Sequence, residues 1–134
     1  MKKYQKELEM MILAGKKAGN EILKYYNKGY DIKIKDDNSE VTNADLASEK
    51  IIKEILMENF PNYAVLSEET YDDKSRLENK YCFIIDPLDG TKDFINKTDS
   101  FAINIALSYK QEIVAGVIVV PCQDIIYYAS KDNG

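Results

Sequence analysis

Residues 81–94 read YCFIIDPLDGTKDF, an apolar run followed by a cluster of acidic residues, a proline and a glycine. The apolar run over 81–85 predicts a buried β-strand, and Asp86 ends the run. Asp89 follows three residues later, with Pro87 between the two carboxylates. The same residues suit an ordinary tight turn, because proline fits the second position of a turn and glycine accepts a positive φ. Taken alone, the pentapeptide DPLDG therefore favours a turn over a binding site.

Hydrophobic spacing outward from this strand predicts two helices followed by several strands. The expected elements, in chain order, are a helix over 2–28, a strand over 30–34, a helix over 42–60, strands over 63–66 and 81–85, a short helix or helical turn over 91–97, and strands over 101–109, 113–120 and 125–129. This order indicates an α+β fold, with two N-terminal helices packed on a largely antiparallel sheet, and not a doubly wound α/β fold. A chain of 134 residues is long enough for one such domain.

Three details of the pattern predict how these elements pack. The expected buried face of the second helix consists of Ala44, Ala47, Ile51 and Ile55, with Leu56 and Phe60 beside it. Gly15 and Gly19 lie four residues apart on the apolar face of the first helix, which predicts close packing against a neighbouring element. The strand over 113–120 is apolar on both faces, which is typical of a central strand.

The composition excludes several classes of function. The chain contains no histidine, which removes Ser-His and Cys-His catalysis and the ordinary histidine-ligated zinc site. A metal ion would therefore be bound by oxygen, which favours a hard cation such as Mg²⁺. The net charge is −5, with acidic and basic residues interspersed, so no basic stripe is present to displace counterions from nucleic acid. We therefore expect no nucleic-acid partner.

The sequence also carries predictions about location and redox state. No apolar run approaches the roughly 20 residues that span a bilayer, and the N-terminal residues lack the apolar core of a signal peptide. We therefore expect no integral membrane segment and a cytoplasmic location. Cys82 and Cys122 lie far apart in apolar runs without a CxxC motif, so we expect two buried thiols and no disulfide.

Further acidic residues can converge on the end of the strand over 81–85. Glu68 and Glu69 follow the short strand over 63–66, so their carboxylates emerge at the same sheet edge if the two strands are neighbours. Asp45, in the first turn of the second helix, is a third candidate, although capping of that helix explains it equally well. Carboxylates that converge without a cation repel one another, whereas with Mg²⁺ they form a hard-oxygen site.

Gly90 and Thr91 add the parts that a phosphate site needs. Backbone N–H groups at the start of a helical turn bind phosphate oxygens, and glycine permits the close approach of a ligand to the backbone. The threonine hydroxyl can orient a water molecule. Together with the carboxylates, these residues suit the metal-assisted hydrolysis of a phosphate monoester, so the expected partner is a small phosphorylated substrate.

Three stretches, VTNAD at 41–45, SEE at 67–69 and DPLDGTKDF at 86–94, resemble the motifs of a superfamily of lithium-sensitive, magnesium-dependent phosphatases. That superfamily includes inositol monophosphatases, fructose-1,6-bisphosphatases and 3′(2′),5′-bisphosphate nucleotidases. The form DPLDGTK, with Lys92 where inositol monophosphatases usually have a second threonine, is most similar to the bacterial nucleotidase branch. The resemblance implies the fold of the N-terminal domain of these enzymes and Mg²⁺ as the cofactor. The substrate would be a nucleotide bisphosphate or a sugar or inositol phosphate.

The resemblance also implies a role for each matching residue. The metal ligands would be Glu68, Asp86, Asp89 and the backbone carbonyl of Leu88. The substrate-binding residues would be Glu68, Leu88, Asp89, Gly90 and Thr91, with the last two offering backbone N–H groups to the phosphate. Glu68, together with Thr91 supported by Asp45, would position the nucleophilic water. Glu69 would support these residues without binding the metal. Lys92 would either help to anchor the substrate or simply be exposed, and exposure is favoured.

Members of this superfamily are longer than this chain, and their second half supplies a W-D-x-A motif whose Asp completes the metal site. The chain contains no tryptophan, so we expect residues 1–134 to form an N-terminal metal- and phosphate-binding domain, with the C-terminal domain absent. Two alternatives to nucleotidase activity remain, namely inositol monophosphatase-type activity and a noncatalytic fragment that binds metal or phosphate. We also expect an exposed apolar sheet face or edge, and self-association through it, where the second half would pack.

Overall fold

The structure is a computed structural model that describes residues 3–35, 40–67 and 79–131. Its elements, in chain order, are α1 (Gln5–Lys28), β1 (Ile32–Ile34), β2 (Glu40–Thr42), α2 (Asn43–Asn59), β3 (Ala64–Ser67), β4 (Tyr81–Asp89), α3 (Thr91–Ile95), β5 (Ala102–Tyr109), β6 (Glu112–Val120), the 3₁₀ helix η2 (Pro121–Gln123) and β7 (Ile125–Ser130). Strands β3 to β7 form a five-stranded sheet in that order.

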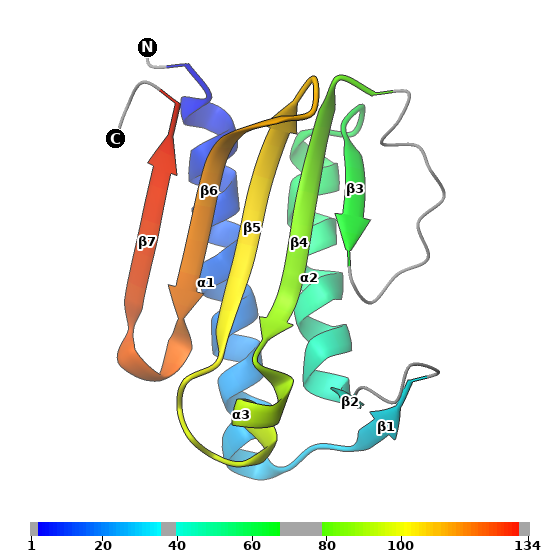
Figure 1. The fold of residues 1–134 in the computed structure, drawn as a ribbon, viewed down its shortest axis with the longest axis vertical. Coiled ribbons are helices and arrows are strands. Elements are labelled where there is room, and N and C mark those ends of the chain that lie inside the picture. Colours follow the sequence, from blue (N-terminus) through cyan, green and yellow to red (C-terminus); the bar gives the residue numbers. More distant parts are fainter. Residues whose placement is uncertain (1–2, 36–39, 68–78, 132–134) are drawn as a thin grey trace.

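The sheet is largely antiparallel, as predicted. Strands β3 and β4 run parallel, and the other neighbouring pairs run antiparallel. Figure 1 shows α1 and α2 side by side on one face of the sheet, with β3 and β7 at its two edges. The expected α+β fold, with two N-terminal helices packed on the sheet, is therefore confirmed.

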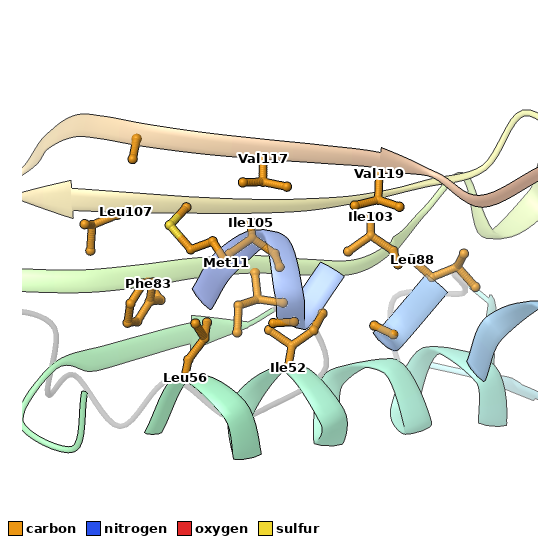
Figure 2. Packing of buried hydrophobic residues seen from close by; sticks show 14 of the residues in the cluster. Met11, Ile52, Leu56, Phe83, Leu88, Ile103, Ile105, Leu107, Val117 and Val119 are labelled. Atoms are coloured by element: carbon orange, nitrogen blue, oxygen red, sulfur yellow. The ribbon is translucent and has the colours of Figure 1, made fainter. Parts of the chain in front are cut away.

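The hydrophobic core lies between the two helices and the sheet (Figure 2). Met11 comes from α1, Ile52 and Leu56 come from α2, and Phe83 and Ile105 come from the sheet; each side chain is 1% exposed or less. Burying one such side chain contributes about 1.5–3 kcal/mol to folding. This packing holds α2 against the strand that carries the candidate site.

Helix α1 approaches the sheet closely at its two glycines, as predicted. A Cβ atom added at Gly15 would lie 2.7 Å from Cγ2 of Val119 on β6. At Gly19 the nearest atom would be Cγ of Pro121, at 3.4 Å, which is an ordinary van der Waals distance. The absence of a side chain is therefore a steric requirement at Gly15 and not at Gly19.

Two predicted strands differ from the observed ones by more than one residue, and one of them matters for the site. The strand expected over 81–85 continues as β4 to Asp89, with an irregularity in the β4–β5 register between Asp86 and Asp89. The DPLDG segment is therefore an irregular strand end and not a simple tight turn, and such irregularities bend a strand and redirect its side chains. The strand expected over 30–34 is shorter, because β1 covers only the residues that pair with β2, a strand that was not predicted.

The buried face of α2 also differs from the prediction. Ala47, Ile51 and Ile55 are only half-buried. The buried residues are Ala44, Asp45, Ser48, Glu49, Ile52 and Leu56. The prediction followed apolar residues alone, whereas half of the observed face is polar and is satisfied by the hydrogen bonds described below.

The sheet face opposite the helices is apolar and exposed. Its cross-strand pairs include Ile84 with Ala106 and Ile118 with Tyr127. Ile118 is 43% exposed and Tyr127 is 58% exposed, and this face forms a hollow of about 610 Å³. The expected exposed apolar face is confirmed. Strand β6 is central by position, as predicted, but only its helix-side face is covered.

Two further predictions concern the membrane and the cysteines. Among the described residues, no helix is both long enough and apolar enough to cross a membrane. Cys82 and Cys122 form no disulfide, as predicted. Cys82 is buried as expected, whereas Cys122 is only half-buried.

Candidate active site

Asp45 is the first residue of the site in chain order, and the local sequence at the start of α2 determines its position. Thr42 and Asp45 form a capping box, in which the Thr42 Oγ1 atom accepts from the backbone N–H groups of Ala44 (3.1 Å) and Asp45 (3.4 Å). In return, Oδ2 of Asp45 accepts from the Thr42 backbone N–H at 2.9 Å and from its hydroxyl at 2.6 Å. The Asp45 side chain is fully buried, so these bonds hold one carboxylate oxygen in place.

The other oxygen of Asp45 reaches the start of α3. The Thr91 hydroxyl lies 3.1 Å from Oδ1 of Asp45 and 3.4 Å from the carbonyl oxygen of Leu88. A hydroxyl has one proton to donate, and the shorter distance is to Asp45. The sequence left open whether Asp45 only caps α2, and the resemblance implies that it supports Thr91; the structure shows the capping bonds and the Thr91 contact together.

The irregular end of β4 presents oxygen atoms on both sides of Pro87. One carboxylate oxygen of Asp86, Oδ1, is buried, whereas Asp89 is exposed and accepts a hydrogen bond from Asn104 Nδ2 at 3.1 Å. Between them, the carbonyl oxygen of Pro87 accepts from the Ser48 hydroxyl at 2.7 Å. Leu88 is buried, and its carbonyl oxygen faces the Thr91 hydroxyl.

Gly90 joins β4 to α3 and adopts the backbone conformation that was predicted for it. Its φ of 87° and ψ of 47° lie in the left-handed region, which glycine enters at little cost. A Cβ atom at this position would lie 3.0 Å from Oδ2 of Asp93. The first N–H groups of a helix have no partner within the helix, so this turn presents backbone donors beside Thr91.

An aromatic cluster around Phe94 anchors α3 to the end of α1. The Phe94 ring is fully buried, and its centroid lies 5.2 Å from that of Tyr26, 4.7 Å from that of Tyr30 and 5.1 Å from that of Phe101. The Tyr30 hydroxyl donates to the carbonyl oxygen of Ile95 at 3.2 Å. These contacts fix α3 against the C-terminal end of α1.

Polar contacts of Tyr26 also hold the loop that follows α3. The Tyr26 hydroxyl donates to Oδ1 of Asp99 at 2.5 Å, and the Lys97 ammonium lies 4.0 Å from the Tyr26 ring centroid. Burial and the Asp99 carboxylate raise the pKa of Tyr26 to about 12. Tyr26 therefore keeps its proton at neutral pH and remains a hydrogen-bond donor.

The structure brings together only some of the predicted site residues. Glu68 and Glu69 lie outside the described residues. Within the described ranges 3–35, 40–67 and 79–131, no group of three acidic, cysteine or histidine side chains is arranged to hold a metal ion. Lys92 is exposed, as expected.

The donors that are described nevertheless match a hard cation in their chemistry. Asp86 and Asp89 offer carboxylate oxygens, and Leu88 lies between them with a backbone carbonyl. Mg²⁺ prefers oxygen ligands of this kind. The described set thus fits Mg²⁺ in ligand type.

Sequence reasoning missed two residues that contact this region, Ser48 and Asn104. Ser48 lies three residues after Asp45, on the same face of the helix, and this spacing was the available signal. Asn104 is a polar residue in an otherwise apolar strand. Its contact with Asp89 depends on the β4–β5 register, which the sequence does not specify at an irregular strand end.

A model of the inositol monophosphatase family matches residues 3–134. The chain is 39% identical over 129 residues to the 3′(2′),5′-bisphosphate nucleotidase CysQ of Haemophilus influenzae, an alignment that covers 95% of this chain and 48% of that protein. It is 34% identical over 129 residues to the inositol-1-monophosphatase of Rhizobium meliloti, with coverages of 95% and 48%.

A solved structure supports the same relationship. The crystal structure of the extragenic suppressor protein suhB from Bartonella henselae superposes with a TM-score of 0.89 and 32% sequence identity, and covers 97% of this chain and 51% of that one. The chain thus spans about half the length of the relatives it matches. The resemblance drawn from the three motifs is confirmed, and the chain belongs to the inositol monophosphatase family.

Proposed function

We propose that residues 1–134 form the Mg²⁺- and phosphate-binding domain of a phosphate monoester hydrolase, whose substrate is a 3′(2′),5′-bisphosphate nucleotide. Members of the family are phosphatases. The reaction would convert 3′-phosphoadenosine 5′-phosphate and water to AMP and phosphate. The observation that carries the proposal is the bond from the Thr91 hydroxyl to the buried Asp45 carboxylate, next to the carbonyl of Leu88.

The residues of the proposed site divide into those that hold Mg²⁺ and those that orient water. Asp86, Asp89, Glu68 and the Leu88 carbonyl would hold the ion. When bound, Mg²⁺ neutralises phosphate charge and lowers the pKa of a coordinated water. The ligand set in this chain would therefore place the phosphate ester at the end of β4.

Thr91 and Asp45 provide the water-orienting part of the proposed site. Because the Thr91 proton is donated to Oδ1 of Asp45, the lone pairs of its oxygen can accept a hydrogen bond from a water molecule. That water would then direct its own lone pair at phosphorus. Its oxygen would form the new P–O bond while the P–O bond to the ribose oxygen breaks, and the proton that the water gives up would end on the departing ribose oxygen.

Backbone groups would hold the transferred phosphate. The N–H groups of Gly90 and Thr91 lie at the start of α3, where the backbone donors favour an anion. Gly90 has no side chain to obstruct the approach. This placement supports a small phosphorylated ligand as the partner of the site.

The choice of substrate rests on the motif form and on the relatives. The DPLDGTK form resembles the nucleotidase branch, and identity to the Haemophilus nucleotidase is 39%, against 34% for the Rhizobium inositol-1-monophosphatase. Inositol monophosphatase-type activity is the second candidate, because the chain aligns with both proteins over 95% of its length.

Phosphate release by the purified chain tests the proposal. The assay compares 3′-phosphoadenosine 5′-phosphate with inositol 1-phosphate, with Mg²⁺, without Mg²⁺, and with Mg²⁺ plus Li⁺. We expect Mg²⁺-dependent release that favours the nucleotide, is inhibited by Li⁺ and is lost in Asp89→Asn. A preference for inositol 1-phosphate would contradict the nucleotidase assignment. Release from neither substrate would contradict catalysis by this chain and support the noncatalytic alternative.

A further inference from the structure

Helix α2 buries three polar side chains on one face, at Asp45, Ser48 and Glu49. They follow the i, i+3, i+4 spacing that places residues on the same side of a helix, and their exposures are 0%, 0% and 9%. Burying a polar side chain costs free energy unless it is hydrogen-bonded. Each of the three is bonded to a different segment of the chain, and Asp45 holds Thr91 as described above.

Ser48 reaches the irregular end of β4. Its hydroxyl donates to the carbonyl oxygen of Pro87 at 2.7 Å, in a buried contact. Pro87 and its neighbour Leu88 fall in the gap of the β4–β5 register between Asp86 and Asp89. The Ser48 bond therefore fixes the backbone where the regular ladder of β5 does not hold it.

Glu49 reaches the end of β3. The Ser67 hydroxyl donates to Oε2 of Glu49 at 3.0 Å, and both residues are buried. The other carboxylate oxygen, Oε1, lies 3.8 Å from the Lys53 ammonium. Ser67 is the last residue of β3 and directly precedes Glu68 in the sequence.

We infer that this polar face of α2 (Asp45, Ser48 and Glu49) is a frame that sets the relative positions of the three segments carrying the site: the start of α3, the irregular end of β4 and the end of β3. Ser48 and Glu49 are positioning residues in this frame, since they act through Pro87 and Ser67. The inference rests on the proposed function for its effect on Mg²⁺, but the frame itself is a property of the packing.

The contact between Ser48 and the end of β4 is tested with Ser48→Ala and a matched control, Ser108→Ala. The Ser108 hydroxyl is also buried and also donates to a backbone carbonyl, that of Cys82 at 3.3 Å. Two readouts are compared in the full chain, namely amide hydrogen exchange at Leu88 and Asp89 and Mg²⁺ affinity by titration calorimetry. Neither readout requires turnover.

We expect Ser48→Ala to accelerate exchange at these two amides beyond the change in Ser108→Ala, and to weaken Mg²⁺ binding about 10-fold, as is usual when support for a metal ligand is removed. Equal effects of the two variants on exchange would overturn the frame. Faster exchange confined to Ser48→Ala, in a chain that binds no Mg²⁺, would instead support the frame and refute the proposed function.

The contact between Glu49 and the end of β3 is tested by comparing Glu49→Ala with Glu49→Gln. Glutamine keeps an acceptor oxygen for the Ser67 hydroxyl, so we expect Glu49→Gln to retain wild-type exchange at Ser67 and wild-type Mg²⁺ affinity. Glu49→Ala removes the acceptor, and we expect faster exchange and weaker binding of about the same size as in Ser48→Ala. If Glu49→Gln behaves like Glu49→Ala, the charge of Glu49 and not its hydrogen bond with Ser67 determines exchange and Mg²⁺ affinity. That result would contradict the proposed positioning of the end of β3 by this bond.

Discussion

The Thr91 hydroxyl lies 3.1 Å from Oδ1 of Asp45, although the two residues are 46 positions apart in the sequence. The contact joins the first residue of α3 to the first turn of α2. Because the second Asp45 oxygen is held by the capping box with Thr42, the Thr91 hydroxyl is held by a carboxylate that is itself fixed. Helix capping and the geometry of the proposed site are therefore properties of the same side chain.

Removing the Thr91 hydroxyl tests its proposed role in orienting water. We expect Thr91→Val to lower kcat for phosphate release by about 100-fold or more, the usual size of such a contribution. KM should change little, because the backbone N–H groups remain. Thr91→Ser keeps the hydroxyl and should retain most of the activity. Equal loss in the two variants would contradict the proposed role, because Thr91→Ser keeps the hydroxyl and only Thr91→Val removes it.

Thr42→Ala should destabilise the fold. It removes the side chain that caps α2 and that holds Oδ2 of Asp45. Loss of an N-cap hydroxyl typically costs about 1–2 kcal/mol, and urea unfolding with circular dichroism measures it. Thr42→Ser keeps the capping oxygen and should lose less than half as much. A Thr42→Ala protein as stable as the wild type would show that the capping box contributes nothing.

The two glycines of α1 should respond oppositely to alanine. At Gly15 the new methyl group would lie 2.7 Å from Val119 Cγ2, and overpacking of this kind costs about 1–3 kcal/mol. At Gly19 the nearest atom is at 3.4 Å, so the higher helix propensity of alanine, about 1 kcal/mol, should stabilise the protein. Thermal unfolding of the two variants measures the difference. The same sign of change in both would contradict the packing of α1 on β6.

The exposed sheet face should cause the chain to self-associate. Ile118 and Tyr127 lie on this face and are each more than two-fifths exposed, and burying such a patch between two copies removes apolar surface from water. We expect the native mass, measured by sedimentation, to rise with concentration. Ile118→Lys should reduce the association, whereas Ile34→Lys, at an exposed residue of β1, should not. A monomer at every concentration would contradict this prediction.

The fold class was predictable because it depends on repeated local signals. The alternation over 101–109 places Phe101, Ile103, Ile105 and Leu107 on the buried side of the sheet, and a period of two over many residues is hard to mistake. The capping box at 42–45 was likewise predictable, because both partners lie within one turn. These signals need no knowledge of distant segments.

The irregular strand end was not predictable for the opposite reason. DPLDG satisfies the stereochemistry of a turn as well as that of a strand end, and the choice involves the bond from Ser48, which is 39 positions away from Pro87. The prediction of the buried face of α2 was wrong for a related reason. Ser48 and Glu49 are buried because distant segments satisfy them, and hydrophobic periodicity contains no information about such partners.

Titration of the chain with Mg²⁺ tests directly whether the end of β4 binds a metal ion. Calorimetry of the wild type is compared with Asp89→Asn and with Asp124→Asn, a matched change at an exposed residue of the β6–β7 turn. We expect saturable binding that Asp89→Asn weakens by about 10-fold or more, equivalent to at least about 1.4 kcal/mol, and that Asp124→Asn leaves unchanged. Equal affinities in all three proteins, or no binding by the wild type, would contradict a metal site at the end of β4.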